Sequence, residues 1–174
     1  VAPGAAIYYY VLEWDPLSLS WADFRGQVLG PTDPATAPAG SLRGMVNSQW
    51  KELGLKQPPN TGDNAVHASA SPFEGLCERM NWLGTPADQD PFGQLLLKSG
   101  VSAEQIQEWS VDPQVTYGPN NITGSLWDAL EDTDVDRCIT KCQMLAAAGS
   151  VKTAKNIALV FIKPHALTEK VKML

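Results

Sequence analysis

The residue in this chain best suited to covalent chemistry is His67, one of two histidines among 174 residues. A neutral imidazole is nucleophilic near neutral pH and accepts a phosphoryl group, provided that a partner fixes its tautomer by accepting a hydrogen bond from the other ring nitrogen. Glu78 follows on the next predicted helix and can be that partner. These two residue types can accept and transfer a phosphoryl group if the fold brings them together.

The sequence around His67 predicts a strand, a turn and a helix. Residues 64–67 form the short strand, and residues 71–74 (Ser-Pro-Phe-Glu) supply an N-cap, a proline at the first helical position and the glutamate of a capping box. The turn before a helix N-terminus favours anions, because its backbone N–H groups are unpaired. The helix is expected to bury Phe73, Leu76, Cys77, Met80 and Leu83.

Three segments upstream must support this site. Residues 5–13 are rich in aromatic and β-branched side chains, which predicts a largely buried strand. Residues 20–30 have apolar residues at helical spacing, and Gly30 ends the helix. Residues 31–63 show no sustained period and are expected to form a long loop with one short helical turn near residues 49–53.

The later part of the chain predicts helices and one further strand. Helical pieces are expected at 91–98, 103–109, 126–130 and 134–148, separated by Pro, Gly and Asn, and we interpret residues 85–153 as a helical linker. Residues 156–164 are a nearly continuous apolar run that ends in Lys-Pro, which predicts a central buried strand with a charged residue at its exit.

Composition limits the partners. A net charge of −6, from 13 basic and 19 acidic residues, argues against a general nucleic-acid binder. No apolar run approaches the roughly 20 residues needed to cross a bilayer, so no membrane association is expected. The expected location is cytoplasmic. Cys77, Cys138 and Cys142 are expected to be thiols, and no metal site is predicted, since no His or further Cys lies near the Cys138–Cys142 pair.

Three motifs in order resemble those of the nucleoside diphosphate kinases. Asn64, His67, Ser69 and Glu78 fall into register with the family's Asn-x-x-His-Gly-Ser-Asp stretch and the glutamate that follows it. Residues 29–35 look like its Gly-x-Thr-Asn/Asp-Pro-Ala segment, and residues 40–44 look like its Gly-Thr-Ile-Arg-Gly. The resemblance covers roughly residues 3–83.

The resemblance implies an α+β ferredoxin-like sandwich that moves γ-phosphate between nucleoside triphosphates and diphosphates through a phosphohistidine. It implies Mg²⁺ bound with ATP or GTP as the cofactor, nucleotides as ligands, His67 as the nucleophile and Glu78 as the group that orients it. The nucleotide-binding residues implied are Thr32, Arg43, Asn64, Ser69, Arg25 and Lys163.

Residues 161–166 resemble the first strand of another copy of the domain, in which the lysine contacts phosphate. The expected division is therefore 1–84 as the later part of one kinase-like domain, 85–153 as a linker and 154–174 as the start of a second domain, with the first domain's own first strand expected before Val1. In the alternative, the Lys163 strand completes the first sheet, like a permuted copy. The tandem arrangement looks like that of family members in cilia and flagella, which implies an axonemal, microtubule-associated location.

Two hypotheses of different classes follow. Ala68 and Ala70 replace a family Gly and Asp, and the stretch between Gly44 and Asn64 is longer than in the family. The first hypothesis is an active enzyme. The second is a catalytically weak or inert scaffold, in which residues 85–150 and several of the six tryptophans bind proteins of a large assembly such as the axoneme or tubulin.

Overall fold

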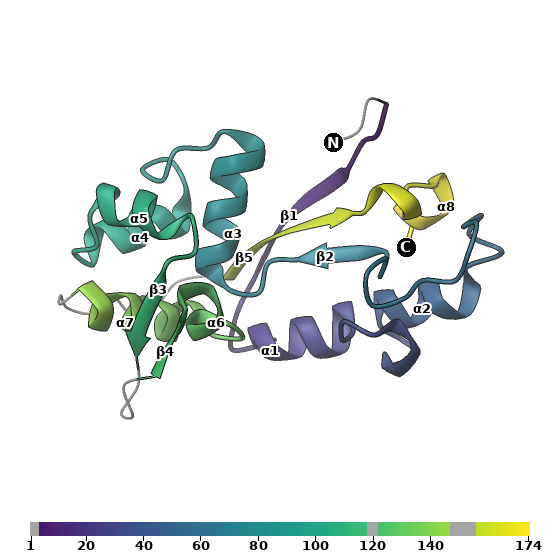
Figure 1. Cartoon of the computed structure of the whole chain (residues 1–174), viewed down its shortest axis with the longest axis horizontal. Helices are drawn as coiled ribbons and strands as arrows, with labels where there is room; N and C mark the ends of the chain where they lie inside the picture. Colours follow the sequence, from purple (N-terminus) through teal and green to yellow (C-terminus); the bar gives the residue numbers. More distant parts are fainter. Residues whose placement is uncertain (1–3, 118–121, 147–155) are drawn as a thin grey trace. The chain divides into compact units, whose positions relative to one another are not determined.

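The computed structural model describes residues 4–117, 122–146 and 156–174 of the chain (Figure 1). Two compact units are present: unit 1 is drawn from residues 1–12, 22–68 and 159–174, and unit 2 from residues 13–21 and 69–158. Helices are mixed with antiparallel strand pairs, which agrees with the α+β class expected from the sequence.

A three-stranded sheet in the order β1-β5-β2 carries the candidate site. Its strands are β1 (Tyr8–Trp14), β2 (Val66–Ala68) and β5 (Asn156–Ile162). β2 and β5 are antiparallel, with His67 opposite Phe161. The prediction of a central buried strand in the last part of the chain is confirmed, because β5 lies between the other two strands and residues 157–160 are buried.

The position of β5 is the one that the sequence offered as the alternative. In this structure the strand that ends near Lys163 is paired with β2 and so belongs to the same sheet as His67. A strand that is apolar along its length needs neighbours on both sides, and β1 and β2 supply them. The division of the chain into two kinase-like domains and a linker stays a prediction.

The expectation that the first strand is largely buried is wrong. β1 is found close to its predicted place, but the side chains from Tyr8 to Leu12 are each more than a third exposed. The strand lies at one edge of the sheet. Its aromatic residues are therefore typical of a strand paired with β5 and do not indicate that the strand is buried.

The segment between residues 20 and 63 contains more helix than the sequence predicted. The helix expected at 20–30 is confirmed as α1 (Trp21–Asp23), which continues as the π-helix η1 (Phe24–Leu29) and ends at Gly30. The loop expected at 31–63 contains η2 (Pro34–Thr36) and the eight-residue helix α2 (Leu42–Gln49). Its N-cap is Ser41, whose hydroxyl accepts a hydrogen bond from Gly44 N.

After β5 the chain of unit 1 ends in η4 (Pro164–Ala166) and α8 (Glu169–Lys172). Hydrogen bonds from Thr168 Oγ1 to Leu53 O (2.8 Å) and from Lys170 Nζ to Glu52 O (2.6 Å) fix this end to the segment that follows α2. Residues 164–172 are therefore part of the same unit as the long loop predicted at residues 31–63.

Unit 2 contains the helix predicted after His67, as α3 (Pro72–Glu78) with its π-helical continuation η3 (Arg79–Leu83). The expected Ser71 cap is confirmed, since its hydroxyl accepts a hydrogen bond from Glu74 N. The four helices predicted downstream are also confirmed, as α4 (Pro91–Lys98), α5 (Ala103–Trp109), α6 (Leu126–Leu130) and α7 (Val135–Ala146). Residues 147 and 148, expected to end the last helix, lie outside the described residues.

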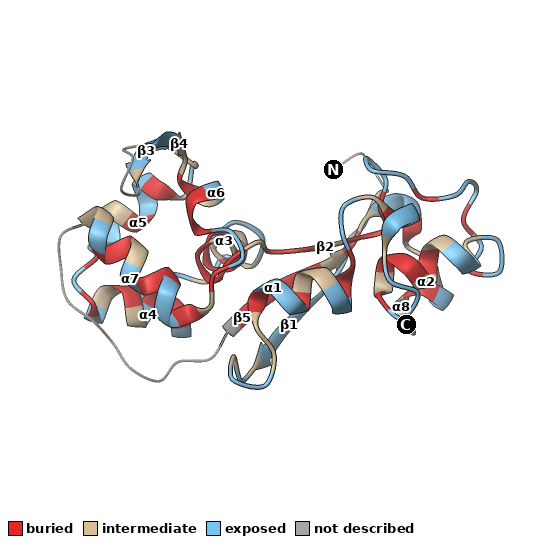
Figure 2. Cartoon of the chain, turned by 90° about the horizontal axis from the view of Figure 1, so that it is seen from below, coloured by how far each residue is buried: buried red, intermediate tan, exposed pale blue. Residues whose placement is uncertain are grey.

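A hairpin of β3 (Gln114–Tyr117) and β4 (Ile122–Ser125) was not predicted. The helices of unit 2 turn their apolar faces inward, as the buried stripes in Figure 2 show. The core that the helices of unit 2 share consists of Phe73, Leu76, Cys77, Phe92, Leu96, Val101, Ile106, Trp109, Leu126, Leu130, Val135, Cys138, Ile139 and Cys142.

Every helix in the described part of the chain is too short or too polar to cross a membrane.

Candidate functional site

His67 is fixed in unit 1 by the pairing of β2 with β5. It lies opposite Phe161, and the two rings stack with centroids 4.7 Å apart and planes inclined by 31°. A further backbone hydrogen bond, from Lys163 N to Ala65 O (2.9 Å), continues the ladder by one more pair. Because side chains alternate along a strand, Phe161 and Lys163 project from the same face of the sheet as His67.

Arg43 comes to the same strand from α2. Its Nη2 donates to Val66 O (3.0 Å) and its Nη1 to Gly30 O (2.8 Å), and the residue is only 8% exposed. The helix that carries it approaches the preceding loop closely, because a Cβ on Gly44 would lie 2.0 Å from Pro38 O. Only glycine permits this approach, and the approach brings the guanidinium beside the residue that precedes His67.

Three cations of unit 1 influence one another at this place. Burial, together with the charge of Arg25, lowers the pKa of Arg43 to about 10. Burial also lowers the pKa of Lys163, the charge of Arg43 lowers it further, and Asp63 partly opposes both. The ammonium of Lys163 donates to Gly62 O at 3.2 Å, which is a carbonyl oxygen and not a carboxylate. The cluster of Arg25, Arg43 and Lys163 is thus an electropositive site formed by three separate segments.

Arg43 and Asn64 each have a buried polar atom without a hydrogen-bond partner among the described residues, namely Nε of Arg43 and Oδ1 of Asn64. Asn64 is 3% exposed, and its Nδ2 donates to Thr32 O at 3.1 Å. A buried donor and a buried acceptor without partners are each costly in a folded protein. Together they suit a ligand that presents both an anionic oxygen and a hydroxyl group.

The backbone between Asn64 and His67 is strained. Ala65 has φ of 72°, in the left-handed region that side-chain-bearing residues rarely adopt, and it is fully buried. Such strain costs about 1–3 kcal/mol, and it is concentrated at functional sites. Here the strained residue lies between Asn64 and His67, and its carbonyl oxygen still accepts the hydrogen bond from Lys163 N that extends the pairing with β5.

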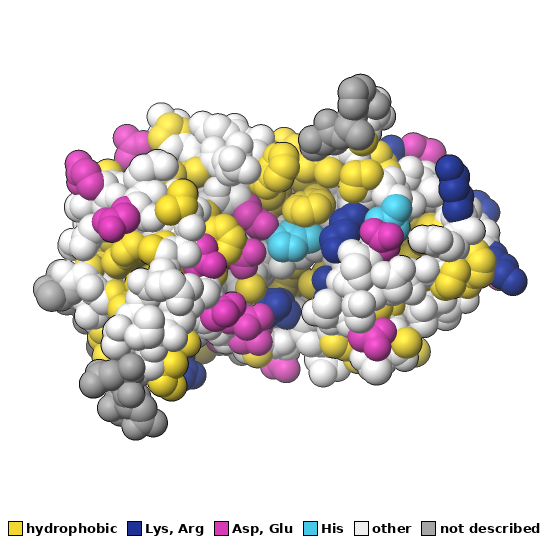
Figure 3. All heavy atoms as spheres, viewed as in Figure 1, with side chains coloured by type: hydrophobic (Ala, Val, Ile, Leu, Met, Phe, Trp, Pro, Cys, Tyr) yellow, Lys and Arg dark blue, Asp and Glu magenta, His cyan; other side chains and the backbone are white. Residues whose placement is uncertain are grey.

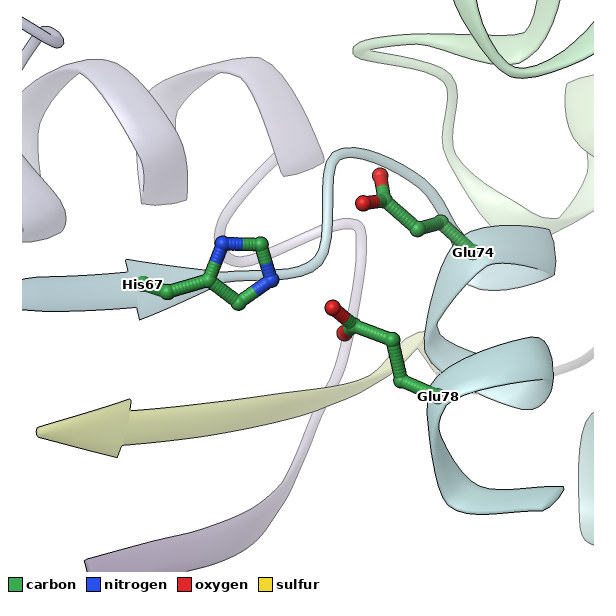
Figure 4. A group of neighbouring side chains, drawn as sticks. All are labelled: His67, Glu74 and Glu78. Carbon is green, nitrogen blue, oxygen red and sulfur yellow. The ribbon is translucent and has the colours of Figure 1, made fainter. Parts of the chain in front are cut away.

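The turn after β2 and the start of α3 belong to unit 2. The buried hydroxyl of Ser69 donates to Glu78 Oε2 at 2.6 Å, and Ala70 N donates to Glu74 Oε2 at 2.7 Å. Ser69 O also accepts a hydrogen bond from Trp21 Nε1 at 3.0 Å. Figure 4 shows His67 on β2, and Glu74 and Glu78 on consecutive turns of α3. The orientation of His67 by Glu78 joins the two units and stays a prediction.

The two departures from the family motif are accommodated locally. Ala68, where the family has glycine, is an ordinary strand residue opposite Val160 and does not have a positive φ. Ala70, where the family has aspartate, uses its backbone N–H to bind Glu74, and no side-chain function is left there.

The residues predicted from the sequence separate into two groups. Unit 1 brings together His67, Arg25, Arg43, Asn64 and Lys163, and also includes Thr32, whose carbonyl holds Asn64 while its side chain is exposed. Unit 2 holds Ser69 with Glu78.

Phe161 was missed by the sequence analysis. The register of β5 against β2 is the signal that identifies it, because this register decides which residue of β5 lies opposite His67.

On the face shown in Figure 3, histidine side chains lie next to lysine or arginine side chains.

Searches of protein-family models, curated proteins and solved structures give no match for this chain.

Proposed function

We propose that the chain is a nucleoside diphosphate kinase-like protein that transfers a γ-phosphate through His67. The observation that carries the proposal is the cluster of Arg25, Arg43 and Lys163. Arg43 donates a hydrogen bond to the carbonyl of Val66, the residue before His67, and Lys163 directly follows β5, the strand paired with β2. Phosphoryl transfer is catalysed mainly by positioning and by positive charge on the phosphate oxygens, and this cluster supplies positive charge beside a nucleophile.

In the proposed reaction a neutral ring nitrogen of His67 attacks the γ-phosphorus of a nucleoside triphosphate. The bond between that phosphorus and the β–γ bridging oxygen breaks, and the electron pair leaves with the diphosphate. A terminal oxygen of a second nucleoside diphosphate then attacks the phosphohistidine and restores the free imidazole. Mg²⁺, which the family binds together with the nucleotide, would neutralise phosphate oxygens during both steps.

Individual contacts support roles for the other residues. The buried Oδ1 of Asn64 suits the acceptance of a hydrogen bond from a sugar hydroxyl, and Nε of Arg43 suits donation to a phosphate oxygen. Phe161 limits the movement of the His67 ring by stacking on it. The ferredoxin-like sandwich implied by the resemblance is part of the same proposal, to which the central position of β5 between β1 and β2 gives support.

Phosphohistidine formation tests the proposal directly. The chain is incubated with Mg²⁺ and γ-labelled ATP, and acid-labile, alkali-stable label is measured. His67→Ala should abolish the label, while His165→Ala should keep it, because His165 is the only other histidine and its Nδ1 lies 3.4 Å from Asp63 Oδ1. Equal labelling of wild type and His67→Ala would exclude His67 as the nucleophile.

The cationic cluster is tested separately by nucleotide binding. Arg43→Gln and Lys163→Gln should each weaken Mg-ADP binding by about tenfold, the effect of losing about 1.4 kcal/mol from a charge-assisted contact. Lys56→Gln, an exposed basic residue of the same unit outside the cluster, is the matched control and should bind as wild type does. Unchanged Mg-ADP binding in both cluster variants would show that the cluster does not bind the nucleotide, and the proposal would lose its support.

The scaffold hypothesis is favoured by a different observation, the exposed edge strand β1. Five consecutive residues from Tyr8 to Leu12 are each at least 36% exposed. Exposed apolar edge strands pair readily with other chains. If the chain is assembled on axonemal microtubules, Tyr9→Lys should reduce its cosedimentation with them and leave phosphohistidine formation unchanged, whereas unaltered cosedimentation would argue against this surface.

A further inference from the structure

One pocket lies wholly within unit 2 and shares no residue with the proposed phosphoryl-transfer site. It has a volume of about 410 Å³ and is lined by residues of β3, α6 and α7. Pockets of about 300–1,000 Å³ are typical of small-molecule sites. Its lining consists of Thr116, Tyr117, Ala129, Leu130, Arg137, Thr140, Lys141, Met144 and Leu145.

Two cations stand on one side of this pocket. Arg137 and Lys141 lie one helical turn apart on α7. The ammonium of Lys141 donates to Ala129 O, and burial lowers the pKa of Lys141, with a further lowering from the charge of Arg137. Within the described part of the chain neither side chain forms an ion pair with a carboxylate.

The charge of the pocket is opposite to that of the unit that contains it. Residues 13–21 and 69–158 include fourteen acidic and six basic residues, a net charge of −8, yet no acidic residue lines the pocket. A cationic pocket in an acidic unit is not a consequence of average composition. It is a local arrangement, and it favours an anionic ligand.

The remaining walls are mostly apolar. Among the lining residues, Leu130 is fully buried and Leu145 is half-buried, whereas Met144 is 76% exposed. Methionine at an exposed position adapts its shape to apolar ligands. Hydroxyl groups are present as well, on Thr116 and Tyr117 of the hairpin and on Thr140 of α7. A simple inorganic anion would leave this apolar surface uncovered.

We propose that this pocket binds a small amphipathic anion, such as an aromatic or aliphatic carboxylate or sulfonate. The acidic group contacts Arg137 and Lys141, and the apolar body lies against Leu130, Leu145 and Met144. The pocket is formed jointly by the β3–β4 hairpin and α7, so a bound ligand holds these two elements together.

The test uses two fluorescent probes that differ in charge. Anilinonaphthalene sulfonate carries the anionic group, and N-phenylnaphthylamine is its neutral counterpart. The folded chain should bind one molecule of the sulfonate saturably and bind the neutral probe at least tenfold more weakly, since the difference between them is one charge-assisted contact worth about 1.4 kcal/mol or more. Dodecanoate should displace the sulfonate.

Variants then locate the binding site. Arg137→Gln and Lys141→Gln should each weaken sulfonate binding by about tenfold and leave the binding of the neutral probe unchanged. Lys98→Gln, an exposed basic residue on α4 of the same unit, is the matched control. Arg137 is exposed, so its replacement does not endanger folding, and far-ultraviolet circular dichroism verifies this. Equal affinity for both probes, or sulfonate binding that is unaltered in both pocket variants, would overturn the proposal.

Discussion

The buried ion pair between Arg79 and Asp90 offers the sharpest test of how unit 2 is held together. Nε of Arg79 lies 2.6 Å from Oδ2 of Asp90, and Nη2 lies 3.1 Å from Oδ1, with side chains 4% and 1% exposed. Asp90 also caps α4 by accepting hydrogen bonds from Phe92 N and Gly93 N, and Arg79 Nη1 donates to Ile157 O. The pair thus joins the end of α3 to α4 and β5.

Removal of either partner is expected to be strongly but unequally destabilising. Breaking a buried pair by deleting one member costs about 3–5 kcal/mol, because the other charge is left buried. Arg79→Met leaves Asp90 with two backbone N–H donors, so we expect a loss of about 3 kcal/mol. Asp90→Ala leaves Arg79 with one carbonyl and also removes the N-cap, worth about 1 kcal/mol, so we expect a loss of about 5 kcal/mol.

The assay is urea unfolding followed by circular dichroism, with the double variant included. Asp90→Ser, which keeps a capping hydroxyl, should recover about 1 kcal/mol of the loss in Asp90→Ala. Arg79→Met/Asp90→Ala should be less destabilised than the sum of the single variants by about 2 kcal/mol or more, since no unpaired charge remains. Single variants that each lose less than about 1 kcal/mol, or losses that simply add, would refute the assignment of this pair as a buried ionic connection.

Three further predictions concern local features. Ala65→Gly should change the free energy of unfolding by less than about 1 kcal/mol, whereas Ala65→Val should lower it by about 2 kcal/mol or more, because a β-branched residue resists a positive φ; thermal unfolding measures both. Gly75→Ala should destabilise by about 1–3 kcal/mol, since its Cβ would lie 2.8 Å from Ile157 O, while Gly26→Ala, which meets nothing within 4 Å, should be neutral or stabilising in the same urea assay. The lowered pKa of Lys163 means that the unfolded chain keeps this proton to higher pH than the folded chain, so the wild type should gain stability relative to Lys163→Gln as the pH rises toward the ordinary lysine pKa of about 10.4, and a difference that stays constant as the pH rises would contradict the burial of its ammonium.

The helices of unit 2 were predictable because local signals begin them, of which the sequence analysis named the Ser71 cap and the structure adds the others. Ser71 and Pro72 at the start of α3, Asp90 and Pro91 at the start of α4, and Ser102 with Gln105 at the start of α5 are capping patterns that act within four residues of the chain. The structure shows the corresponding side-chain hydrogen bonds in each case. Such signals survive any tertiary arrangement, because the groups that satisfy one another are adjacent in sequence.

The features that the sequence analysis missed depend on distant partners or on short segments. α2 is only eight residues long, and what distinguishes it from a loop is the packing of Gly44 against Pro38 and the hydrogen bonds of Arg43 to Gly30 O and Val66 O. The β3–β4 hairpin has only four residues on each side, too few for an alternating pattern to be distinctive. The sequence left the place of β5 open between two alternatives, because it is decided by neighbours about 90 and 150 residues away in sequence.

Prediction of the candidate site was limited in the same way. The types of Asn64, His67 and Arg43 were readable from motif spacing, but the stacking of Phe161 on His67 required the register of β2 with β5. Without that register, Lys163 had no defined relation to His67.

The cationic cluster also explains why a ligand should matter to the stability of unit 1. Arg43 is buried and satisfies two of its N–H groups with the carbonyls of Gly30 and Val66, which compensate its hydrogen-bonding capacity but not its charge. Its electrostatic neighbours of note are the cations Arg25 and Lys163. Within the described residues its Nε has no partner, so the guanidinium is left both desolvated and repelled. A bound polyphosphate would relieve both penalties at once, and an anion that binds only the folded chain raises its apparent stability. The thermal midpoint should therefore rise with Mg-ADP in the wild type and much less in Arg43→Gln, which has no such charge to relieve.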